Sequence, residues 1–267
     1  KVDSSSKSLK GRFPFRLGTV SYILPDDILP NVRYLADRID DIELVLFESD
    51  EISNIPDKAA IAGLASIAGE KDLTYTVHLP LDVFLGAREE KRRTASVEKC
   101  LRVIERTLPL EPFSYILHFH GDRRGASPSP DIPLWKAQHR LSLEQLLKAV
   151  PGPMLAVETL DYPFRLVEDI VAEFGLSVCL DAGHIWLNGY DLEEAIERYA
   201  DRIRVIHLHG VEGGVDHKDI SSLSESQIGS VIAAAEAGEA ERVLTLEMFS
   251  EAELEKSLQI LRRLIAG

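Results

Sequence analysis

From residue 16 onward the sequence alternates between short apolar runs and longer stretches with helical periodicity. Eight runs are rich in Val, Ile, Leu or Tyr, and they start roughly 32 residues apart, the repeat length of a (β/α)₈ barrel of about 250 residues. Several runs are almost continuously apolar, as expected for strands covered on both faces. The predicted strands are Arg16–Ile23, Asp41–Glu48, Thr74–Pro80, Tyr115–His120, Met154–Leu160, Ser177–Asp181, Ile203–His209 and Val243–Phe249. We therefore predict one α/β domain, a (β/α)₈ TIM barrel over residues 16–267, preceded by an N-terminal arm over residues 1–15.

The stretches between these runs predict the outer helices of the barrel. Val97, Cys100 and Ile104, for example, follow the i, i+3, i+7 spacing of one helix face. A doubly wound sheet is the competing architecture, but the segment Gly18-Thr-Val-Ser in the first run is not a glycine-rich phosphate loop. Residues 121–133, rich in Gly and Pro, follow the fourth strand, and they are either a lid over the active-site face or a tolerated surface insertion.

The charge and cysteine content exclude several classes of protein. Acidic residues outnumber basic ones by 44 to 30, so the formal net charge is −14, and general binding of nucleic acid or membrane is not expected. Cys100 and Cys179 provide no disulfide framework and favour a reducing, cytoplasmic location. No apolar run approaches the ~18 residues of a membrane span. The serine-rich first ten residues lack the apolar middle of a signal peptide and indicate a loose arm.

Histidines gather at the predicted strand ends. The chain has 8 histidines, and windows of about five residues at eight strand ends would hold about one of them by chance. Six lie there, namely His78, His118, His120, His184, His207 and His209, while His217 follows the seventh strand and His139 lies in a predicted helix. The i, i+2 spacing of His118 with His120, and of His207 with His209, puts both imidazoles of each pair on one strand face.

Carboxylates share this distribution. Glu158, Asp181 and Glu247 end apolar strands, and Asp216 follows the seventh strand. A buried carboxylate must be paired, protonated or bound to a metal, and no Lys or Arg occupies a matching strand end. Imidazole and carboxylate together suit Zn²⁺, Mn²⁺ or Fe²⁺ rather than Mg²⁺ or Ca²⁺ alone. Four carboxylates contribute −4, so one divalent ion leaves a negative site suited to a neutral sugar, two neutralise it, and three leave +2, which attracts a phosphodiester.

These residues stand in a familiar order. The segments are Val-His78-Leu-Pro, Leu-His118, Val-Glu158-Thr, Leu-Asp181-Ala-Gly-His184, Ile-His207-Leu, Asp216-His217 and Leu-Glu247. In this order they resemble the xylose-isomerase-like TIM-barrel superfamily, which includes metal-dependent apurinic-site endonucleases and sugar isomerases and epimerases. The resemblance covers nearly the whole predicted barrel.

The resemblance implies two or three divalent metal ions, with zinc the foremost candidate. The implied ligands are His78, His118 and Glu158 for a first ion, Glu158, Asp181, His207 and Glu247 for a second, and His184, Asp216 and His217 for a third. The third set departs from the endonuclease pattern Asp-x-His, because Asp216 and His217 are adjacent. His120 and His209 are additional to the pattern and are either ligands, hydrogen-bond donors behind the ligands, or substrate contacts.

The first third of the chain resembles one branch more closely. The segments 17–25 (LGTVSYILP), 28–32 (ILPNV) and 40–48 (DDIELVLFE) are similar to the cobamide-remodelling phosphodiesterases. This resemblance implies hydrolysis of the phosphodiester in the nucleotide loop of a vitamin B12-type corrinoid. Glu158 and Glu247 would then orient the ions and the attacking water, and His184 or His209 would protonate the leaving group.

Substrate contacts and rival functions stay open at this stage. Arg123 and Arg124 either meet the phosphate or the corrin rim or are a solvated pair, and Tyr22, Phe119 and Trp186 either stack on a flat ligand or pack within the protein. A sugar isomerase or epimerase with one ion would use Glu158, Asp181, His207 and Glu247 but would leave three histidines, His78, His118 and His217, without work. An apurinic-site endonuclease conflicts with the charge of −14, and a non-catalytic metal- or corrinoid-binding protein is a further alternative.

Overall fold

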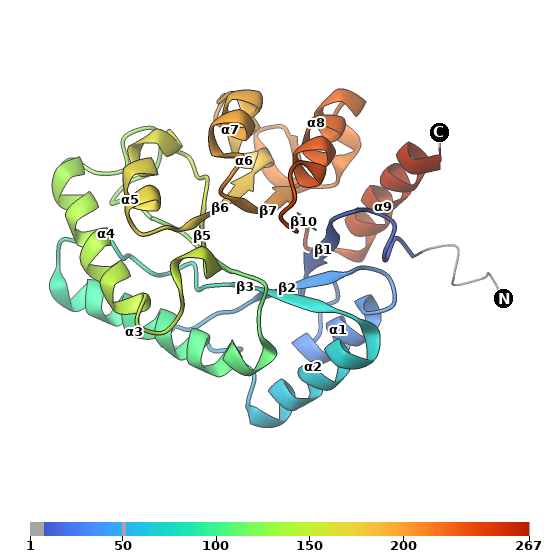
Figure 1. Cartoon of the computed structure of the whole chain (residues 1–267), viewed down its shortest axis with the longest axis horizontal. Coiled ribbons are helices and arrows are strands. Elements are labelled where there is room, and N and C mark those ends of the chain that lie inside the picture. Colours follow the sequence, from blue (N-terminus) through green and yellow to red (C-terminus); the bar gives the residue numbers. More distant parts are fainter. Residues whose placement is uncertain (1–7, 50–51, 267) are drawn as a thin grey trace.

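Eight parallel strands close into a barrel that outer helices surround (Figure 1). The computed structural model describes residues 8–49 and 52–266. The barrel strands are β1 (Arg16–Val20), β2 (Asp41–Val45), β3 (Thr74–His78), β4 (Tyr115–Leu117), β5 (Leu155–Glu158), β6 (Ser177–Asp181), β7 (Ile203–Leu208) and β10 (Val243–Leu246). Their order around the barrel is β1, β10, β7, β6, β5, β4, β3, β2, so β1 pairs with both β2 and β10. The predicted (β/α)₈ TIM barrel is confirmed.

The helices follow the strands along the chain and cover the outside of the barrel. They are α1 (Ile28–Leu35), α2 (Lys58–Lys71), α3 (Glu90–Thr107), α4 (Ile132–Leu146), α5 (Glu168–Glu173), α6 (Ala182–Leu187), α7 (Leu192–Tyr199), α8 (Glu225–Glu236) and α9 (Glu251–Ala266). Seven of the eight barrel strands begin where the sequence predicts, but most end earlier. The predicted strand Tyr115–His120, for instance, stops at Leu117. Most of the extra residues are buried although they belong to no strand, and for that reason sequence alone extends the strands into the loops.

Alternation along the strands separates the barrel interior from the helix layer. Ile116, Ala156, Cys179, Val205 and Val243 form an apolar layer of their own inside the barrel. On four of these strands the inward residue two positions later is ionisable; these residues are His118, Glu158, Asp181 and His207. The interior therefore changes from apolar to ionisable toward the carboxyl ends of the strands.

Phe119 lies outside this interior. It stands between two inward histidines and is fully buried, with its ring centroid 4.4 Å from that of His139 on α4. Because adjacent residues of an extended segment face opposite sides, Phe119 packs under a helix and does not stack on a ligand in the barrel mouth.

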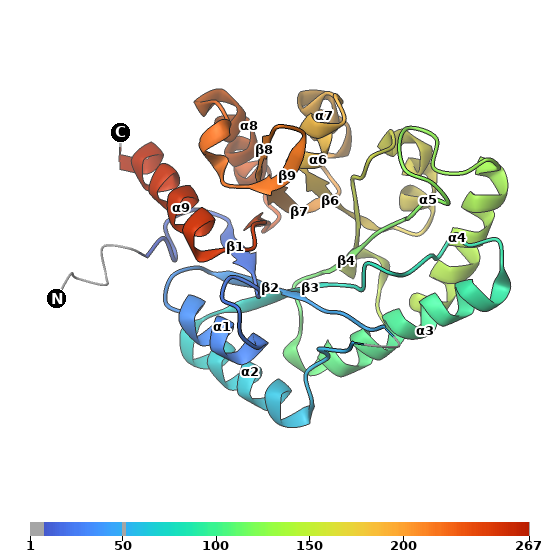
Figure 2. The ribbon, with the colours of Figure 1, turned by 180° about the vertical axis from the view of Figure 1, so that it is seen from behind.

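The structure contains a hairpin that the sequence analysis treated as a loop. It consists of β8 (Gly210–Glu212) and β9 (Val215–Lys218), which pair antiparallel, follow β7 along the chain and contact α6 (Figure 2). Gly213 and Gly214 form its turn with φ of 60° and 79°. Two successive residues at positive φ are what a tight hairpin turn requires, so the Gly-Gly pair was the available signal. The hairpin carries Asp216 and His217.

Two peripheral segments pack more closely than the sequence suggested. Residues 1–7 of the predicted arm lie outside the described residues, but within residues 8–15 the side chains of Leu9 and Phe15 are buried in the core. In residues 121–133, interpreted above as a lid or a surface insertion, the Gly125 N–H donates a 2.7 Å hydrogen bond to Asp161 Oδ2 in the loop after β5. Among the described residues, no helix is long and apolar enough to cross a membrane.

Gly86 offers a test of the packing that supports the β3–α3 loop. A Cβ at Gly86 would overlap the ring of His139 and lie 2.6 Å from Trp135 Cδ1, and both side chains are buried. We expect Gly86→Ala to lower the free energy of unfolding by about 1–3 kcal/mol because this site cannot accept the extra atom. Denaturant unfolding measures the change. Gly69→Ala is the matched control: Gly69 is exposed in α2 with open space around its Cα, so that variant should gain about 0.5 kcal/mol. Equal stability of the two variants would contradict the packing argument.

Candidate metal centre

The barrel mouth holds a cavity of about 850 Å³ whose lining combines the predicted ligands with loop residues. His78, His118, Glu158, His184, Asp216, His217 and Glu247 all line it. Asp181 and His207 are fully buried beneath it. The structure thus brings all nine residues of the predicted ligand sets together at the carboxyl ends of the strands, where TIM-barrel active sites lie.

The first group joins β3, β4 and β5. Glu158 Oε2 lies 2.8 Å from His118 Nε2 and 3.4 Å from His78 Nε2, and all three side chains are almost completely buried. The His118 contact is a short hydrogen bond, and the longer His78 contact is also a separation that two ligands of a shared ion adopt. Oxygen and imidazole nitrogen from three adjacent strands therefore converge on one point.

The second group surrounds His207 on β7. Its Nδ1 lies 3.1 Å from Glu247 Oε2, 3.6 Å from Asp181 Oδ2 and 3.8 Å from Glu158 Oε2. Glu158 and Asp181 end β5 and β6, and Glu247 directly follows β10, so residues from four strand ends enclose the point that Nδ1 faces.

The sequence analysis missed one residue here, Glu43. It lies on β2, is fully buried, and its Oε2 accepts a 2.9 Å hydrogen bond from His207 Nε2. The available signal was an acidic residue inside a buried strand, but Glu43 was given no role because it lies two residues before the end of β2.

The third group depends on an unusual backbone conformation. Asp216 and His217 are adjacent on β9, where regular alternation would turn their side chains to opposite sides. His217 instead has φ of 53°, in the left-handed region, and both side chains face His184 of α6. Asp216 Oδ2 lies 3.7 Å from His184 Nε2 and 3.8 Å from His217 Nε2. The departure from Asp-x-His spacing is thus compensated by one positive φ.

The second ring nitrogens of the buried imidazoles also have partners. His78 Nδ1 donates to the Leu79 carbonyl at 2.8 Å, and His207 Nε2 donates to Glu43. His118 Nδ1 lies 3.3 Å from His120 Nε2. Hydrogen-bonded outer nitrogens fix the ring orientation and the tautomer, and this arrangement typically surrounds metal-bound histidines. We assign these tautomers from the partners.

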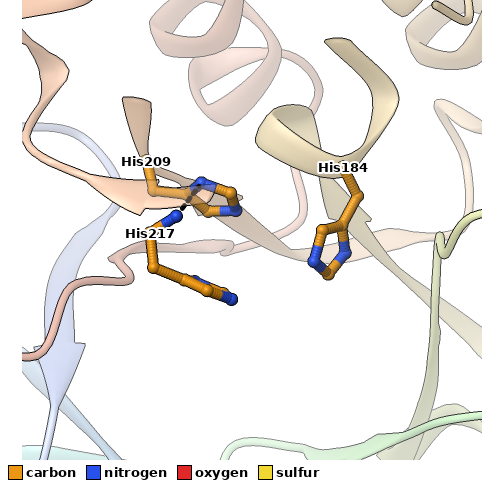
Figure 3. Close-up of side chains that lie close together, drawn as sticks. All are labelled: His184, His209 and His217. Carbon is orange, nitrogen blue, oxygen red and sulfur yellow. Dashed lines mark hydrogen bonds between the residues drawn. The ribbon is translucent and has the colours of Figure 1, made fainter. Parts of the chain in front are cut away.

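His209 differs from these histidines, because its Nδ1 accepts a hydrogen bond. Its Nδ1 accepts a 3.0 Å hydrogen bond from the backbone N–H of His217, as Figure 3 shows, and its Nε2 lies 3.1 Å from Asp181 Oδ1. Burial lowers the pKa of His209, and the Asp181 charge more than offsets this, so the pKa is raised. The N–H aimed at Nδ1 nevertheless favours a neutral ring. His209 is fully buried and does not line the cavity, so it is not placed to protonate a leaving group.

The predicted substrate contacts divide into two sets. His120, Arg123 and Arg124 line the cavity, and both arginines are exposed at its mouth. Burial and the neighbouring His118 lower the pKa of His120 to about 4, so its ring is neutral at pH 7. Within the described part of the chain, the cavity lining includes neither Tyr22, which is 49% exposed, nor Trp186, which packs against the hydrophobic core.

The chemistry of the donor set fits divalent metal ions. Three buried atoms, His207 Nδ1, His217 Nδ1 and Glu247 Oε2, have no hydrogen-bond partner, although Glu247 Oε2 lies 3.1 Å and 3.5 Å from the two nitrogens. Over residues 8–49 and 52–266, the ion-pair partners within 4.0 Å of Glu43, Glu158, Asp181, Asp216 and Glu247 are all histidines. Nitrogen and oxygen atoms that lack hydrogen-bond partners and converge with no Lys or Arg beside them are what a Zn²⁺-type site provides.

Without metal, protons hold this cluster together. Burial lowers the pKa of His78, but the hydrogen bond to Glu158 and the charges of Glu43 and Glu158 more than offset this and raise it to about 9. Burial also lowers the pKa of His184, and the charge of Asp181 with the bond to Glu158 raises it to about 10. Burial raises the pKa of Glu158, but the charge of His118 and the bonds from His118, His184 and His78 hold it well below its usual range. Protons and metal ions therefore compete for the same sites.

Comparison with known proteins identifies the family. A model of the xylose isomerase-like TIM barrel family matches residues 35–264, which is most of the chain. The chain therefore belongs to this family. A search of the curated proteins found no significant sequence match.

Solved structures of several activities share the fold. A D-tagatose 3-epimerase-like protein superposes with a TM-score of 0.75 at 17% identity over 94% of this chain and 97% of its own. The 3-keto-D-glucoside 4-epimerase from E. coli superposes with a TM-score of 0.71 at 15% identity, over 95% of this chain and 100% of its own. Endonuclease IV from Thermus thermophilus superposes with a TM-score of 0.69 at 18% identity, over 94% of this chain and 98% of its own. At these identities the similarity is one of fold.

Glu43 gives the first test of the metal centre. Glu43→Gln removes the charge that orients His207 through its Nε2–H, so we expect zinc affinity to fall about 10–100-fold. Competition titration of the metal-stripped protein with a zinc indicator measures it. Glu48→Gln is the matched control, because Glu48 follows the same strand but pairs with Arg102 outside the site. The role of Glu43 is refuted if both variants bind zinc as the parent does.

The raised histidine pKa values give the second test. A group whose pKa rises on folding stabilises the fold below its unfolded value, about 6.5 for histidine, and this stabilisation is lost as pH rises through the folded value. For His78 and His184 the loss should fall between about pH 6.5 and the folded values of about 9 and 10. We therefore expect the melting temperature of chelator-treated protein to fall in this window, and the difference from zinc-loaded protein to widen. A difference independent of pH would contradict the proton–metal competition.

Proposed function

We propose that the chain is a metal-dependent phosphodiesterase. The observation that carries the proposal is the continuity of the three ligand groups: Glu158 contacts the histidines of the first group, lies 3.8 Å from His207 Nδ1, and its Oε1 lies 3.2 Å from His184 Nδ1 of the third. A site for one ion needs only one of these groups. Adjacent sites that share a carboxylate are typical of enzymes that hold a phosphate between ions.

The residues of this site would have two roles, holding ions and contacting substrate or water. The groups His78–His118–Glu158, Asp181–His207–Glu247 and His184–Asp216–His217 would hold the ions. Divalent ions bound there would supply Lewis-acid chemistry, because they offset charge on a phosphate and ease the deprotonation of water. His120 is neutral and lines the cavity, so it can accept a hydrogen bond from substrate or water. His184 faces the cavity and can donate to a departing oxygen where it holds no ion.

Electrostatics favour an anionic substrate once three ions are bound. The five carboxylates of the cluster, with Glu43 included, contribute −5, so three divalent ions leave a net charge of +1 and one ion leaves −3. Arg123 and Arg124 add positive charge at the mouth. A phosphodiester therefore suits a site with three ions, whereas a site with one ion repels it.

The proposed substrate is a cobamide, cleaved in its nucleotide loop. Support comes from the similarity of the segments at 17–25, 28–32 and 40–48 to cobamide-remodelling phosphodiesterases. The cavity of about 850 Å³ is larger than a phosphate requires and lies within the range of small-molecule sites. The formal charge of −14 argues against a nucleic-acid substrate.

A single-ion sugar epimerase is the second candidate, and the structural similarity to epimerases favours it. It would use Glu158, Asp181, Glu247 and His207. It assigns no role to His78 and His118, which contact Glu158. It also leaves the convergence of Asp216 and His217 on His184 unexplained. Metal stoichiometry separates the two functions.

The direct test incubates metal-loaded protein with a complete cobamide and follows release of the lower nucleotide base by liquid chromatography. We expect turnover with two or three zinc equivalents per chain, and a loss of more than about 100-fold in Glu158→Gln and Asp181→Asn. Glu48→Gln is the control and should keep full activity. Binding of one equivalent together with epimerisation of D-tagatose would favour the epimerase. Cleavage of abasic duplex DNA would favour an endonuclease, and metal binding without turnover of any of these would indicate a binding protein.

A further inference from the structure

We propose that His209 is a positioning residue that joins Asp181 to the hairpin β8–β9. The inference rests on the proposed metal site and adds a residue to it that would bind neither ion nor substrate. Three histidines, His184, His209 and His217, lie close enough together to be taken for a three-imidazole site. In Figure 3 they come from three elements: His184 from α6, His209 from the end of β7 and His217 from the hairpin.

The hydrogen bonds of His209 remove it from the ligand set. His209 Nδ1 lies 3.0 Å from the His217 backbone nitrogen and 3.3 Å from the Gly210 carbonyl oxygen. The shorter contact, from an N–H that must donate, needs a lone pair on Nδ1, so the carbonyl contact is not a hydrogen bond and the ring proton of neutral His209 lies on Nε2. That proton is aimed at Asp181, whose Oδ1 and Oδ2 lie 3.1 Å and 3.3 Å away. Neither ring nitrogen has a lone pair left for an ion. His78 and His207 differ, because their outer nitrogens donate and their inner nitrogens face the carboxylates.

The surroundings of the ring hold it in this orientation. His209 is fully buried, and a Cβ on Gly183 would overlap the His209 ring. Gly183 is helical and has no positive φ, so the space that its missing side chain leaves is what the ring requires. The segment Asp181-Ala-Gly-His184 therefore does two things at once: it supplies two candidate ligands and makes room for the ring behind them.

Asp181 gains a fixed orientation from this arrangement. Its Oδ1 accepts from the His184 backbone N–H at 2.7 Å, which caps α6, and the His209 Nε2–H approaches the same carboxylate. The other ring nitrogen of His209 anchors the residue whose φ of 53° turns Asp216 and His217 toward His184. One imidazole thus fixes a carboxylate of the second group and the backbone of the third.

The test uses two substitutions in the full-length protein. His209→Leu removes both hydrogen bonds, whereas the amide of His209→Gln keeps one donor and one acceptor. We expect zinc affinity, measured by competition titration, to fall about 10–100-fold in the leucine variant and less than about tenfold in the glutamine variant, with the number of bound ions unchanged in both. Hydrogen exchange at the His217 amide should be faster in His209→Leu and restored in His209→Gln. His139→Gln, a buried histidine of α4 outside the site, is the control and should leave zinc affinity unchanged.

Each outcome decides the proposal. Loss of one zinc equivalent in both His209 variants would make His209 a ligand, and unchanged affinity and exchange in His209→Leu would remove its role; either result overturns the proposal. If His209→Leu does not fold, Gly183→Ala displaces the same ring and should also accelerate exchange at the His217 amide. The exchange measurement needs no metal. If the parent protein binds no zinc or hydrolyses no phosphodiester, the proposed function fails while the exchange result still decides the role of His209.

Discussion

The structure depends on an electrostatic constraint: carboxylates are buried at the barrel mouth with only imidazoles beside them. Burying a charge costs several kcal/mol unless it is paired or coordinated. Glu43, Asp181 and Glu158 are at most 1% exposed, and in the described part of the chain their ion-pair partners are histidines. Imidazole can meet this charge either as a cation or as a neutral metal ligand, so the same atoms allow the protein to exist with protons or with ions in the cluster.

The barrel makes this concentration of charge feasible because the middle and the carboxyl end of each strand have different roles. The middle of the strands supplies an apolar interior layer, and the carboxyl ends bring side chains from different strands to one point. Parallel pairing sets the register, so Asp181 lies opposite His207 and Thr245 opposite the same histidine on the other side. The helices outside complete the core without contributing most of the candidate ligands; His184 on α6 is the exception.

Sequence predicts the parts of this structure that follow from period and chemistry. The strands show in their apolar runs, and nearly all candidate ligands show as ionisable residues at the ends of those runs. Glu43 escaped notice because it sits inside a strand, where a carboxylate is recognisable only once His207, 164 residues away in sequence, is placed beside it. The role of His209 depends on which nitrogen meets a backbone N–H, and no sequence pattern carries that information. Tyr22 and Trp186 are aromatic residues after strands, but loop geometry decides whether such residues face the cavity.

The loop that carries Gly125 can change in sequence without changing the barrel interior, because a hydrogen bond to Asp161 links it to the rest of the barrel. Every strand-end residue of the cluster is fixed by the barrel itself, whereas Arg123 and Arg124 stand on a loop held to its neighbour by a single described backbone-to-carboxylate bond. Insertions or deletions in that loop would alter which molecules gain entry while leaving the interior atoms in place. Changes in this loop can in this way alter the range of substrates without altering the residues of the metal centre.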